Sequence, residues 1–400
     1  MEKTWRWFGP NDVIALNDLR QIGVEGIVTA LHHIPNGDIW PVGEIRKRKA
    51  IIASAGLRWS VVESLPVSEE IKLASPASAR HLENYRISLK NLAAEGIRTV
   101  CYNFMPVIDW IRTDLYRENP DGTRSLYFDY ARFAYFDRYI LQRKNATDDY
   151  PAPILERTET IHSTIKEEEK EELIHNIIVK TQGFVSGNIS EKDKEPVALF
   201  RKMLSRYEGM HQEDLRDHFR RFMETVAPVA AENNVNLCIH PDDPPFPVLG
   251  LPRIVTGRED VDWLLKAVDV FQNGLTFCAG SLSSGIHNNV PELAKRFAPR
   301  THFVHLRSTE VFQNRDFMEA DHLSGRGHLA EVIRIFLEEQ KRRLREGMDS
   351  WRIPMRPDHG PLMLSDIDND RYNPGYSFYG RMKALSELSG MMAAVESVNP

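Results

Sequence analysis

The chain has 400 residues, of which 42% are hydrophobic and 27% are charged, and these proportions are typical of a globular protein rather than a disordered one. Its formal net charge of −6 argues against a nucleic-acid partner, which would require a basic surface. The N-terminus, MEKTWRWFGPND, lacks the apolar core of a signal peptide, and no run approaches the roughly eighteen apolar residues of a membrane span. We therefore expect a cytoplasmic protein with neither a membrane nor a nucleic-acid partner.

Short apolar runs alternate along the chain with longer segments whose apolar residues recur three and four positions apart. Eight of the short runs predict strands, at residues 4–9, 26–31, 58–64, 98–104, 236–241, 275–280, 302–308 and 353–359. Helical patterns separate most of them, and such alternation requires parallel pairing. Eight strands of this kind predict an α/β fold, a (β/α)₈ TIM barrel. An open doubly wound sheet is the alternative, but no glycine-rich dinucleotide loop follows the first strand.

Residues 105–210 do not fit the repeat. They contain aromatic and charged sequence, such as LYFDYARFAYFDRYILQRK, with helical spacing that is too regular for a disordered linker. We expect one domain, 1–400, with a largely helical insertion at 105–210 after the fourth strand. An insertion in this position covers the carboxyl ends of the strands, as a lid or as an oligomer contact.

Polar residues end the last four predicted strands. The fifth ends at His240, the sixth at Cys278, the seventh at His305, and the eighth at Asp358 followed by His359. Because the carboxyl ends of barrel strands meet on one face, two imidazoles, a thiolate and a carboxylate can bind one divalent ion there. Taken singly, His240 is explained as a hydrogen-bonded loop residue and Cys278 as part of the core. The prediction of a metal site depends on the agreement of all four strand ends.

A set of separate motifs also runs in one order along nearly the whole chain. They include RWFGPND, GIVTALHHIP, HPDDPPFPVLGLPRIV, LTFCAGS, HLRST and RPDHG. Together they resemble the mannonate dehydratase family. The resemblance implies a xylose-isomerase-like barrel, a requirement for Mn²⁺ with Fe²⁺ as the close alternative, and conversion of D-mannonate to 2-keto-3-deoxy-D-gluconate and water. It places metal ligands at the same four positions, His240, Cys278, His305 and Asp358, and a tyrosine of the PGY segment at Tyr376.

This chemistry assigns expected roles to further residues. Dehydration of a sugar acid removes the proton beside the carboxylate and expels hydroxide from the next carbon, so a metal ion is needed to stabilise the enolate-like intermediate. Arg307 and Arg356 either clamp the substrate carboxylate or pair with aspartates at the end of the barrel. His359 and Tyr376 are the expected proton-transfer pair, with Tyr376 favoured near the departing hydroxyl. Which of the two is the base and which is the acid remains open.

Other residues have weaker assignments. Asp242 and Asp243 are alternative bases, or they orient His240 or bind sugar hydroxyls, and we take Asp242 as a substrate-binding candidate. Arg6 and Trp7 point to opposite sides of the first strand, and one of these sides lines the barrel mouth. We take Trp7 as the candidate for substrate contact, although the pattern does not decide the face.

Alternative functions and metals remain open at this point. Ligand softness favours Zn²⁺ or Fe²⁺ for this donor set, and only the resemblance places Mn²⁺ first. A metal-dependent sugar isomerase or epimerase on the same barrel is the nearest rival, but it would typically need more carboxylates for a second ion. A metal-dependent nuclease would need a basic rim. A barrel that has lost catalysis would have lost ligand residues. For the expected enzyme the partner is a small sugar acid, and we expect a homodimer.

Overall fold

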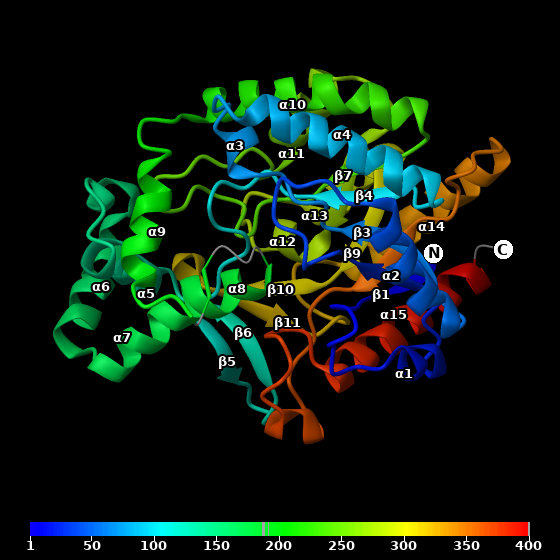
Figure 1. Cartoon of the computed structure of the whole chain (residues 1–400). Helices are drawn as coiled ribbons and strands as arrows, with labels where there is room; N and C mark the ends of the chain where they lie inside the picture. Colours follow the sequence, from blue (N-terminus) through cyan, green and yellow to red (C-terminus); the bar gives the residue numbers. More distant parts are fainter. Residues whose placement is uncertain (186–188, 191, 399–400) are drawn as a thin grey trace.

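The structure is a computed structural model that describes residues 1–185, 189–190 and 192–398. At its centre is a closed barrel of parallel strands in the order β1-β12-β9-β8-β7-β4-β3-β2 (Figure 1). The barrel strands are β1 (Glu2–Arg6), β2 (Gly26–Thr29), β3 (Arg58–Glu63), β4 (Thr99–Tyr102), β7 (Asn236–Ile239), β8 (Asn273–Cys278), β9 (Thr301–Leu306) and β12 (Pro354–Pro357). Each predicted strand overlaps one of these, and the prediction of a (β/α)₈ barrel is confirmed.

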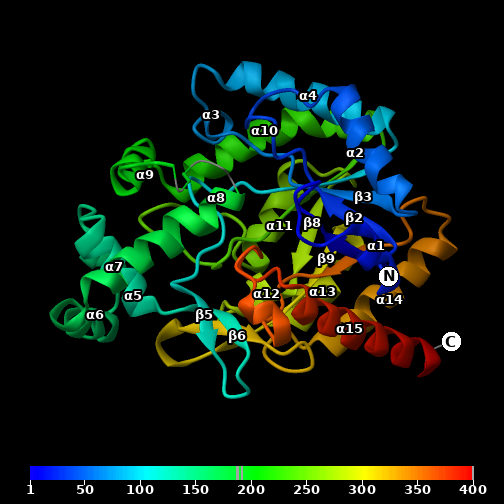
Figure 2. The same cartoon turned by 60° about the horizontal axis from the view of Figure 1, so that its bottom comes forward.

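Helices cover the outside of the barrel. They are α1 (Leu16–Gln21), α2 (Val42–Ser54), α3 (Glu69–Lys72), α4 (Ser78–Ala94), α10 (Gln212–Glu232), α11 (Arg258–Ala267), α12 (Ala279–Ser283), α13 (Val290–Phe297), α14 (Leu329–Arg345) and α15 (Phe378–Val398). The segment LRDHFRRFMETVAPVAAENN, with apolar residues three and four positions apart, forms most of α10, which starts where the backbone N–H of His211 donates to the Asp214 carboxylate at 2.8 Å. Its apolar face lies against α4 (Figures 1 and 2), where the rings of Tyr85 and Phe222 meet edge to face at 5.1 Å. Among the described residues, no helix combines the length and the apolar character needed to cross a membrane.

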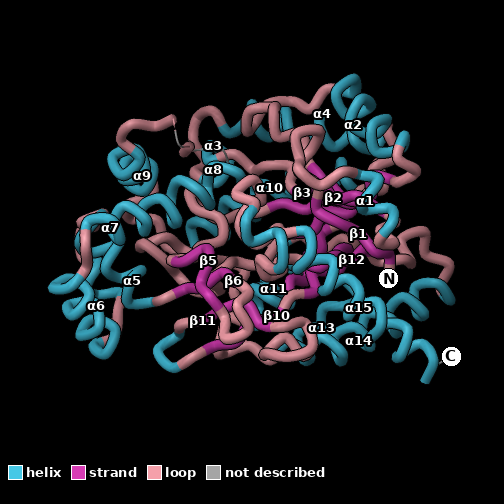
Figure 3. Tube along the Cα trace, turned by 90° about the horizontal axis from the view of Figure 1, so that it is seen from below, coloured by secondary structure: helices cyan, strands magenta, loops and turns pink. Residues whose placement is uncertain are grey.

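The segment between β4 and α10 forms a second layer beside the barrel. It contains a hairpin, β5 (Asp114–Glu118) and β6 (Arg124–Phe128), and helices α5 (Tyr130–Tyr135), α6 (Ala152–Thr164), α7 (Glu167–Ile174), α8 (Thr181–Val185) and α9 (Pro196–Ser205). The hairpin pairs with β10 (Ser308–Val311) and β11 (Phe317–Ala320), which follow β9, in an antiparallel sheet of order β10-β11-β6-β5 (Figure 3). We call this sheet, helices α5–α9 and residues 105–113, which lead from β4 into the sheet, the inserted layer. The sequence patterns predicted its helices but not its sheet.

Groups of buried side chains hold these parts together. The main core lies between the barrel strands and the outer helices. A separate core fills the inserted layer, and there the rings of Phe128 on β6 and Phe317 on β11 stack at 5.0 Å. A small cluster inside the barrel contains Val28, Val61, Cys101, Cys238 and Phe303. The barrel interior is therefore closed by packed side chains, and only its carboxyl end is available for a site.

Candidate active site

A cavity of about 200 Å³ lies at the carboxyl ends of the barrel strands. Barrel residues form one part of its wall, among them Arg6, Glu63, Asn103, His240, Arg307, Arg356, Asp358, His359 and Tyr376. The inserted layer and its connection to β4 form another part, which includes Val107, Asp109, Trp110 and Gly183. The cavity is thus built jointly by the barrel and by the segment that the repeat pattern could not explain.

Three predicted metal ligands converge beside this cavity, and one of them, His240, is part of its wall. Donor atoms of His240, Cys278 and His305 all lie within 4.8 Å of one another. Cys278 on β8 and His305 on β9 are direct partners in the strand register, and His240 follows the end of β7. Oδ2 of Asp358 lies 3.5 Å from the Cys278 sulfur and 3.9 Å from Nδ1 of His305, at the edge of this cluster.

The environment of both histidines favours lone pairs that point at one common centre. Nε2 of His240 and Nδ1 of His305 are 3.2 Å apart. Nδ1 of His240 lies 2.7 Å from the carbonyl oxygen of Pro241, which can only accept, so this nitrogen carries the proton. Nε2 of His305 lies 3.6 Å from Oε1 of Glu63. With the outer nitrogens facing acceptors, the inner nitrogens are free to coordinate, as in carboxylate–histidine–metal arrangements.

The Cys278 sulfur has several polar partners. Cys278 precedes α12, and its sulfur accepts from the backbone N–H of Ser281 at 3.4 Å and from the Ser281 hydroxyl at 3.2 Å. Nη2 of Arg307 lies 3.7 Å away, and Oδ2 of Asp358 lies 3.5 Å away. The thiolate is the form of cysteine that binds metals. Together with the two imidazoles, this sulfur makes a donor set that fits a divalent transition-metal ion.

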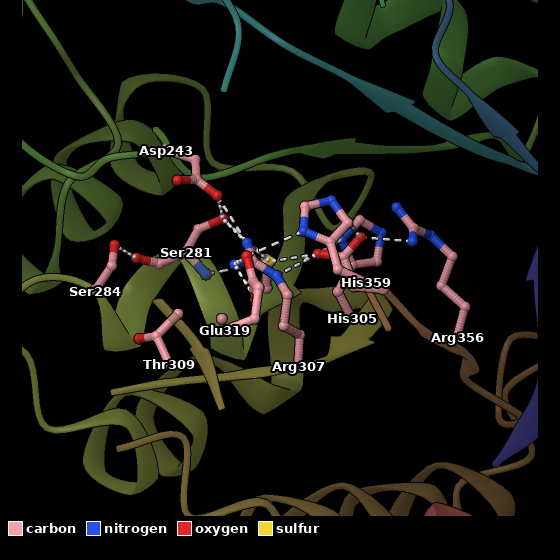
Figure 4. Close-up of polar contacts among 12 residues, drawn as sticks. Asp243, Ser281, Ser284, His305, Arg307, Thr309, Glu319, Arg356 and His359 are labelled. Atoms are coloured by element: carbon pink, nitrogen blue, oxygen red, sulfur yellow. Dashed lines mark hydrogen bonds and ion pairs between the residues drawn. The ribbon is translucent and has the colours of Figure 1, made fainter. Parts of the chain in front are cut away.

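Arg307 lies at the centre of a buried network of charges (Figure 4). Its Nε donates to Asp358 at 2.8 Å, and its Nη2 donates to Asp243 at 2.7 Å. Its Nη1 lies 3.0 Å from both carboxylate oxygens of Glu319 on β11. All the nitrogens of this guanidinium are therefore engaged by protein carboxylates. These contacts support the alternative in which Arg307 pairs with carboxylates at the barrel end.

Arg356 has a similar arrangement. Two of its nitrogens bind Glu63 at 2.8 and 3.0 Å, and the third binds Asp358 at 2.6 Å. Burial alone would raise the pKa of Asp358, but Arg356, His359, His305 and Arg307 around it hold that pKa well below its ordinary value. The pKa of Glu63 is also held well below its ordinary value, because Arg356, His305 and Arg6 outweigh its burial. Both carboxylates are therefore ionised at neutral pH.

His359 and Tyr376 stand side by side in the cavity wall. Their rings meet nearly at right angles at 5.2 Å, and the indole of Trp110 lies 5.3 Å from the imidazole. A backbone hydrogen bond of 2.9 Å from the Gly360 N–H to the Gly375 carbonyl joins the two segments that carry them. Burial raises the pKa of the Tyr376 phenol above its ordinary value, so this side chain keeps its proton at neutral pH and can donate it.

Two candidates from the sequence do not reach the cavity. Trp7 lies in the main core, where its indole N–H donates to the carbonyl of Ile14 at 3.2 Å. Arg6, on the opposite face of the strand, lines the cavity instead. The buried carboxylate of Asp242 accepts from the backbone N–H groups of Ile254 and Val255 at 3.0 and 2.8 Å. Its role is thus to hold a loop, and direct substrate contact by Trp7 or Asp242 is not supported.

Sequence reasoning missed several residues of the site. Glu63 closes a predicted strand, just as the histidines do, and this signal was sufficient to find it. Arg112, Trp110 and Glu319 belong to the inserted layer, and no local pattern places them at the barrel end. Asp243, one of the alternative bases, is bound by Arg112 at 2.8 Å and by Arg307 at 2.7 Å. These two arginines outweigh its burial and lower its pKa, so it acts as an ion-pair partner.

A TIM barrel with clustered imidazole and thiol donors, ion-paired carboxylates and an adjoining histidine–tyrosine pair defines a class of protein: a metal-dependent barrel enzyme that transfers protons on a small polar substrate. Within that class, the chain belongs to the D-mannonate dehydratase (UxuA) family, whose model matches residues 1–399. It is 45% identical to the mannonate dehydratase of Marinomonas sp. (strain MWYL1), over 99% of this chain and all of the relative.

Two further comparisons agree with this family. The chain is 44% identical to the mannonate dehydratase of Chromohalobacter salexigens, over the full length of both proteins. It is also similar to the crystal structure of mannonate dehydratase from Streptococcus suis serotype 2, with a TM-score of 0.76 and 29% identity. That alignment covers 100% of this chain and 96% of the other. The resemblance seen in the sequence motifs is confirmed, and a sugar isomerase or epimerase is not favoured.

Proposed function

We propose that the protein is a hydro-lyase that converts D-mannonate to 2-keto-3-deoxy-D-gluconate and water. One observation supports the proposal beyond family membership: the donor atoms of His240, Cys278 and His305 approach one another beside the cavity whose wall contains His359 and Tyr376. Dehydration needs both a metal ion and proton-transfer groups, because the proton beside a carboxylate is weakly acidic and hydroxide is a poor leaving group.

The metal-binding residues in this proposal are His240, Cys278, His305 and Asp358. The first three are supported by the close approach of their donor atoms, and Asp358 by its ionised state and its 3.5 Å distance from the sulfur. A divalent ion bound there would supply Lewis-acid stabilisation of the negative charge that develops beside the substrate carboxylate. The family is metal-dependent, and we propose Mn²⁺ with Fe²⁺ as the alternative. The sulfur and nitrogen donors themselves favour Zn²⁺ or Fe²⁺.

The proposed proton transfers use His359 and Tyr376. His359 removes the proton from the carbon beside the carboxylate, and the Tyr376 phenol donates its proton to the hydroxyl that leaves the next carbon as water. The protonated state of the phenol suits the second role. The resulting enol becomes the 2-keto product when the carbon that lost its hydroxyl takes up a proton and the enol hydroxyl on the neighbouring carbon gives one up. These two transfers return His359 and Tyr376 to their starting protonation states. One water molecule is lost and no oxidant is consumed.

Arg6 is the proposed contact for the polar groups of the substrate, in place of Trp7. Its guanidinium is buried in the cavity wall, and its Nε has no hydrogen-bond partner among the described residues. Its other nitrogens make only long contacts, 3.5 Å to Glu63 and 3.4 Å to His32. Arg307 and Arg356, whose nitrogens are fully engaged, are proposed to hold Asp358 and Glu63 in place rather than to clamp the substrate. Arg6 therefore has donors to offer to a carboxylate or hydroxyl.

The remaining expectations also stay proposals. We propose that the inserted layer covers the cavity as part of a single domain, supported by the positions of Asp109, Trp110 and Gly183 in the cavity wall. A homodimer in the cytoplasm stays a prediction, and light scattering on the purified protein would test its oligomeric state.

The direct test is to load the protein with Mn²⁺ or Fe²⁺, incubate it with D-mannonate, and assay for a 2-keto-3-deoxy acid. We expect product with either ion, and none after chelation. D-Fructuronate and D-mannose serve as control substrates that an isomerase or epimerase would convert. Conversion of a control without a keto-deoxy acid from D-mannonate would overturn the proposal.

A further inference from the structure

Glu319 lies on β11 of the inserted layer, yet its carboxylate reaches the barrel's proposed catalytic histidine. Oε1 of Glu319 is 3.2 Å from Nδ1 of His359. The same carboxylate binds Arg307 at 3.0 Å and Arg112 at 3.0 Å. Figure 4 shows the side chains of Glu319, Arg307 and His359 directed toward one another.

We infer that Glu319 is a positioning residue: it holds His359 through Nδ1, so that Nε2 is the atom that exchanges protons with the substrate. The inference rests on the proposed dehydration of D-mannonate and adds the group that orients its base. It also gives the sheet of the inserted layer, to which β11 belongs, a role in the chemistry beyond covering the barrel.

The geometry supports this assignment from three sides. Two arginines keep Glu319 ionised, so its oxygens only accept and Nδ1 of His359 must be the donor. Nε2 lies on the other side of the ring, toward the metal-binding cluster, 3.9 Å from Oδ1 of Asp358. The rings of Trp110 and Tyr376 also contact the imidazole, with centroid distances of 5.3 and 5.2 Å. A carboxylate that fixes the tautomer and orientation of an imidazole is a recurring catalytic device.

Arg112 links this device to the rest of the inserted layer. It is fully buried, and besides Glu319 it binds Asp243 at 2.8 and 3.3 Å. Its guanidinium also lies 4.7 Å from the ring centre of Phe317 on β11. Glu319 is thus held from both sides by cations, and its oxygen cannot move away from Nδ1 without breaking an ion pair.

Two variants test the inference on the metal-loaded enzyme. Glu319→Gln removes the charge, and Glu319→Asp keeps the charge for the arginines but withdraws it from the imidazole. For both we expect kcat on D-mannonate to fall about 10–100-fold, as for other groups that orient a functional side chain, with KM changed less than about threefold and bound metal unchanged. Glu310→Gln, at an exposed position of β10 in the same sheet, is the matched control and should behave like the wild type.

A double-mutant cycle separates positioning from a merely structural role. The rates are measured in single turnover with enzyme in excess. When Glu319→Gln is added to His359→Asn, the rate should fall by less than about a further twofold, because the effect of Glu319 passes through the imidazole. An equal loss in both backgrounds, a loss of metal, a large rise in KM, or full activity of both Glu319 variants would overturn the inference. If the wild-type enzyme itself makes no keto-deoxy acid, it is the proposed function that fails.

Discussion

The two parts of the active site differ in how they are built. The barrel supplies the donor atoms His240, Cys278 and His305 from strand ends, where each is fixed by the register of its own strand. The inserted layer supplies Arg112 and Glu319, which contact these groups only through other side chains. In the proposed mechanism the barrel end therefore provides the reactive groups, and the inserted layer provides charged side chains that hold them in place. Substitutions at the barrel end should therefore change metal binding and chemistry. Substitutions in the inserted layer should change stability and the orientation of the site residues.

The largest effect is expected from Cys278→Ser. Replacing the sulfur should abolish retention of the metal and reduce the dehydration rate below detection, because a hydroxyl is a poor ligand for a transition metal. Cys238→Ser is the control, since Cys238 is a buried cysteine of the barrel interior that belongs to the packing cluster. Metal content after gel filtration and activity measure the difference. Equal metal content in the two variants would remove Cys278 from the ligand set.

Tyr376→Phe should affect chemistry without affecting the metal. Loss of the phenolic proton donor is expected to lower kcat by about 10²–10⁴-fold, the range for a general acid or base. The ring contact with His359 is kept, so metal content and the thermal unfolding temperature should match the wild type. A kcat within threefold of the wild type would mean that another group protonates the leaving hydroxyl.

Arg112→Met tests the inserted layer. The substitution leaves Asp243 and Glu319 as buried carboxylates that each lose one cation, which should lower the free energy of unfolding by about 3–5 kcal/mol. Lys295→Met is the matched control, because its ion pair with Glu292 is exposed and should contribute less than about 1 kcal/mol. Urea unfolding of the metal-free proteins measures both. Similar stabilities of the two variants would show that the Arg112 network does not hold the layer.

The smallest effect concerns pH. Burial would raise the pKa of Glu319, but Arg307, His359 and Arg112 lower it to about 2, against an ordinary value of 4.5. Because the folded pKa is the lower one, the stability that Glu319 contributes is present above about pH 5.5 and is lost as the pH falls toward 2. Between pH 5.5 and 3.5 the wild type should lose about 1 kcal/mol more than Glu319→Gln. Parallel pH profiles would show that this carboxyl titrates normally.

The barrel end and the inserted layer also differ in how far the sequence could predict them. His240 and Cys278 could be predicted as site residues because an apolar run that ends in a polar residue is a local pattern, and the parallel topology brings such ends together. Glu63 carries the same signal at the end of β3. Arg112 and Glu319 carry no such signal. They meet because the β5–β6 hairpin pairs with β11, and that pairing joins segments far apart in the chain.

The most direct test of the barrel-end site is the absorption spectrum of the protein after Co²⁺ is added to the metal-free form. If Cys278 binds the ion together with His240 and His305, the wild type and Cys238→Ser will both show a thiolate-to-cobalt charge-transfer band in the near ultraviolet, and Cys278→Ser will not. A band that survives in Cys278→Ser, or Co²⁺ bound by the wild type without any such band, would contradict the site.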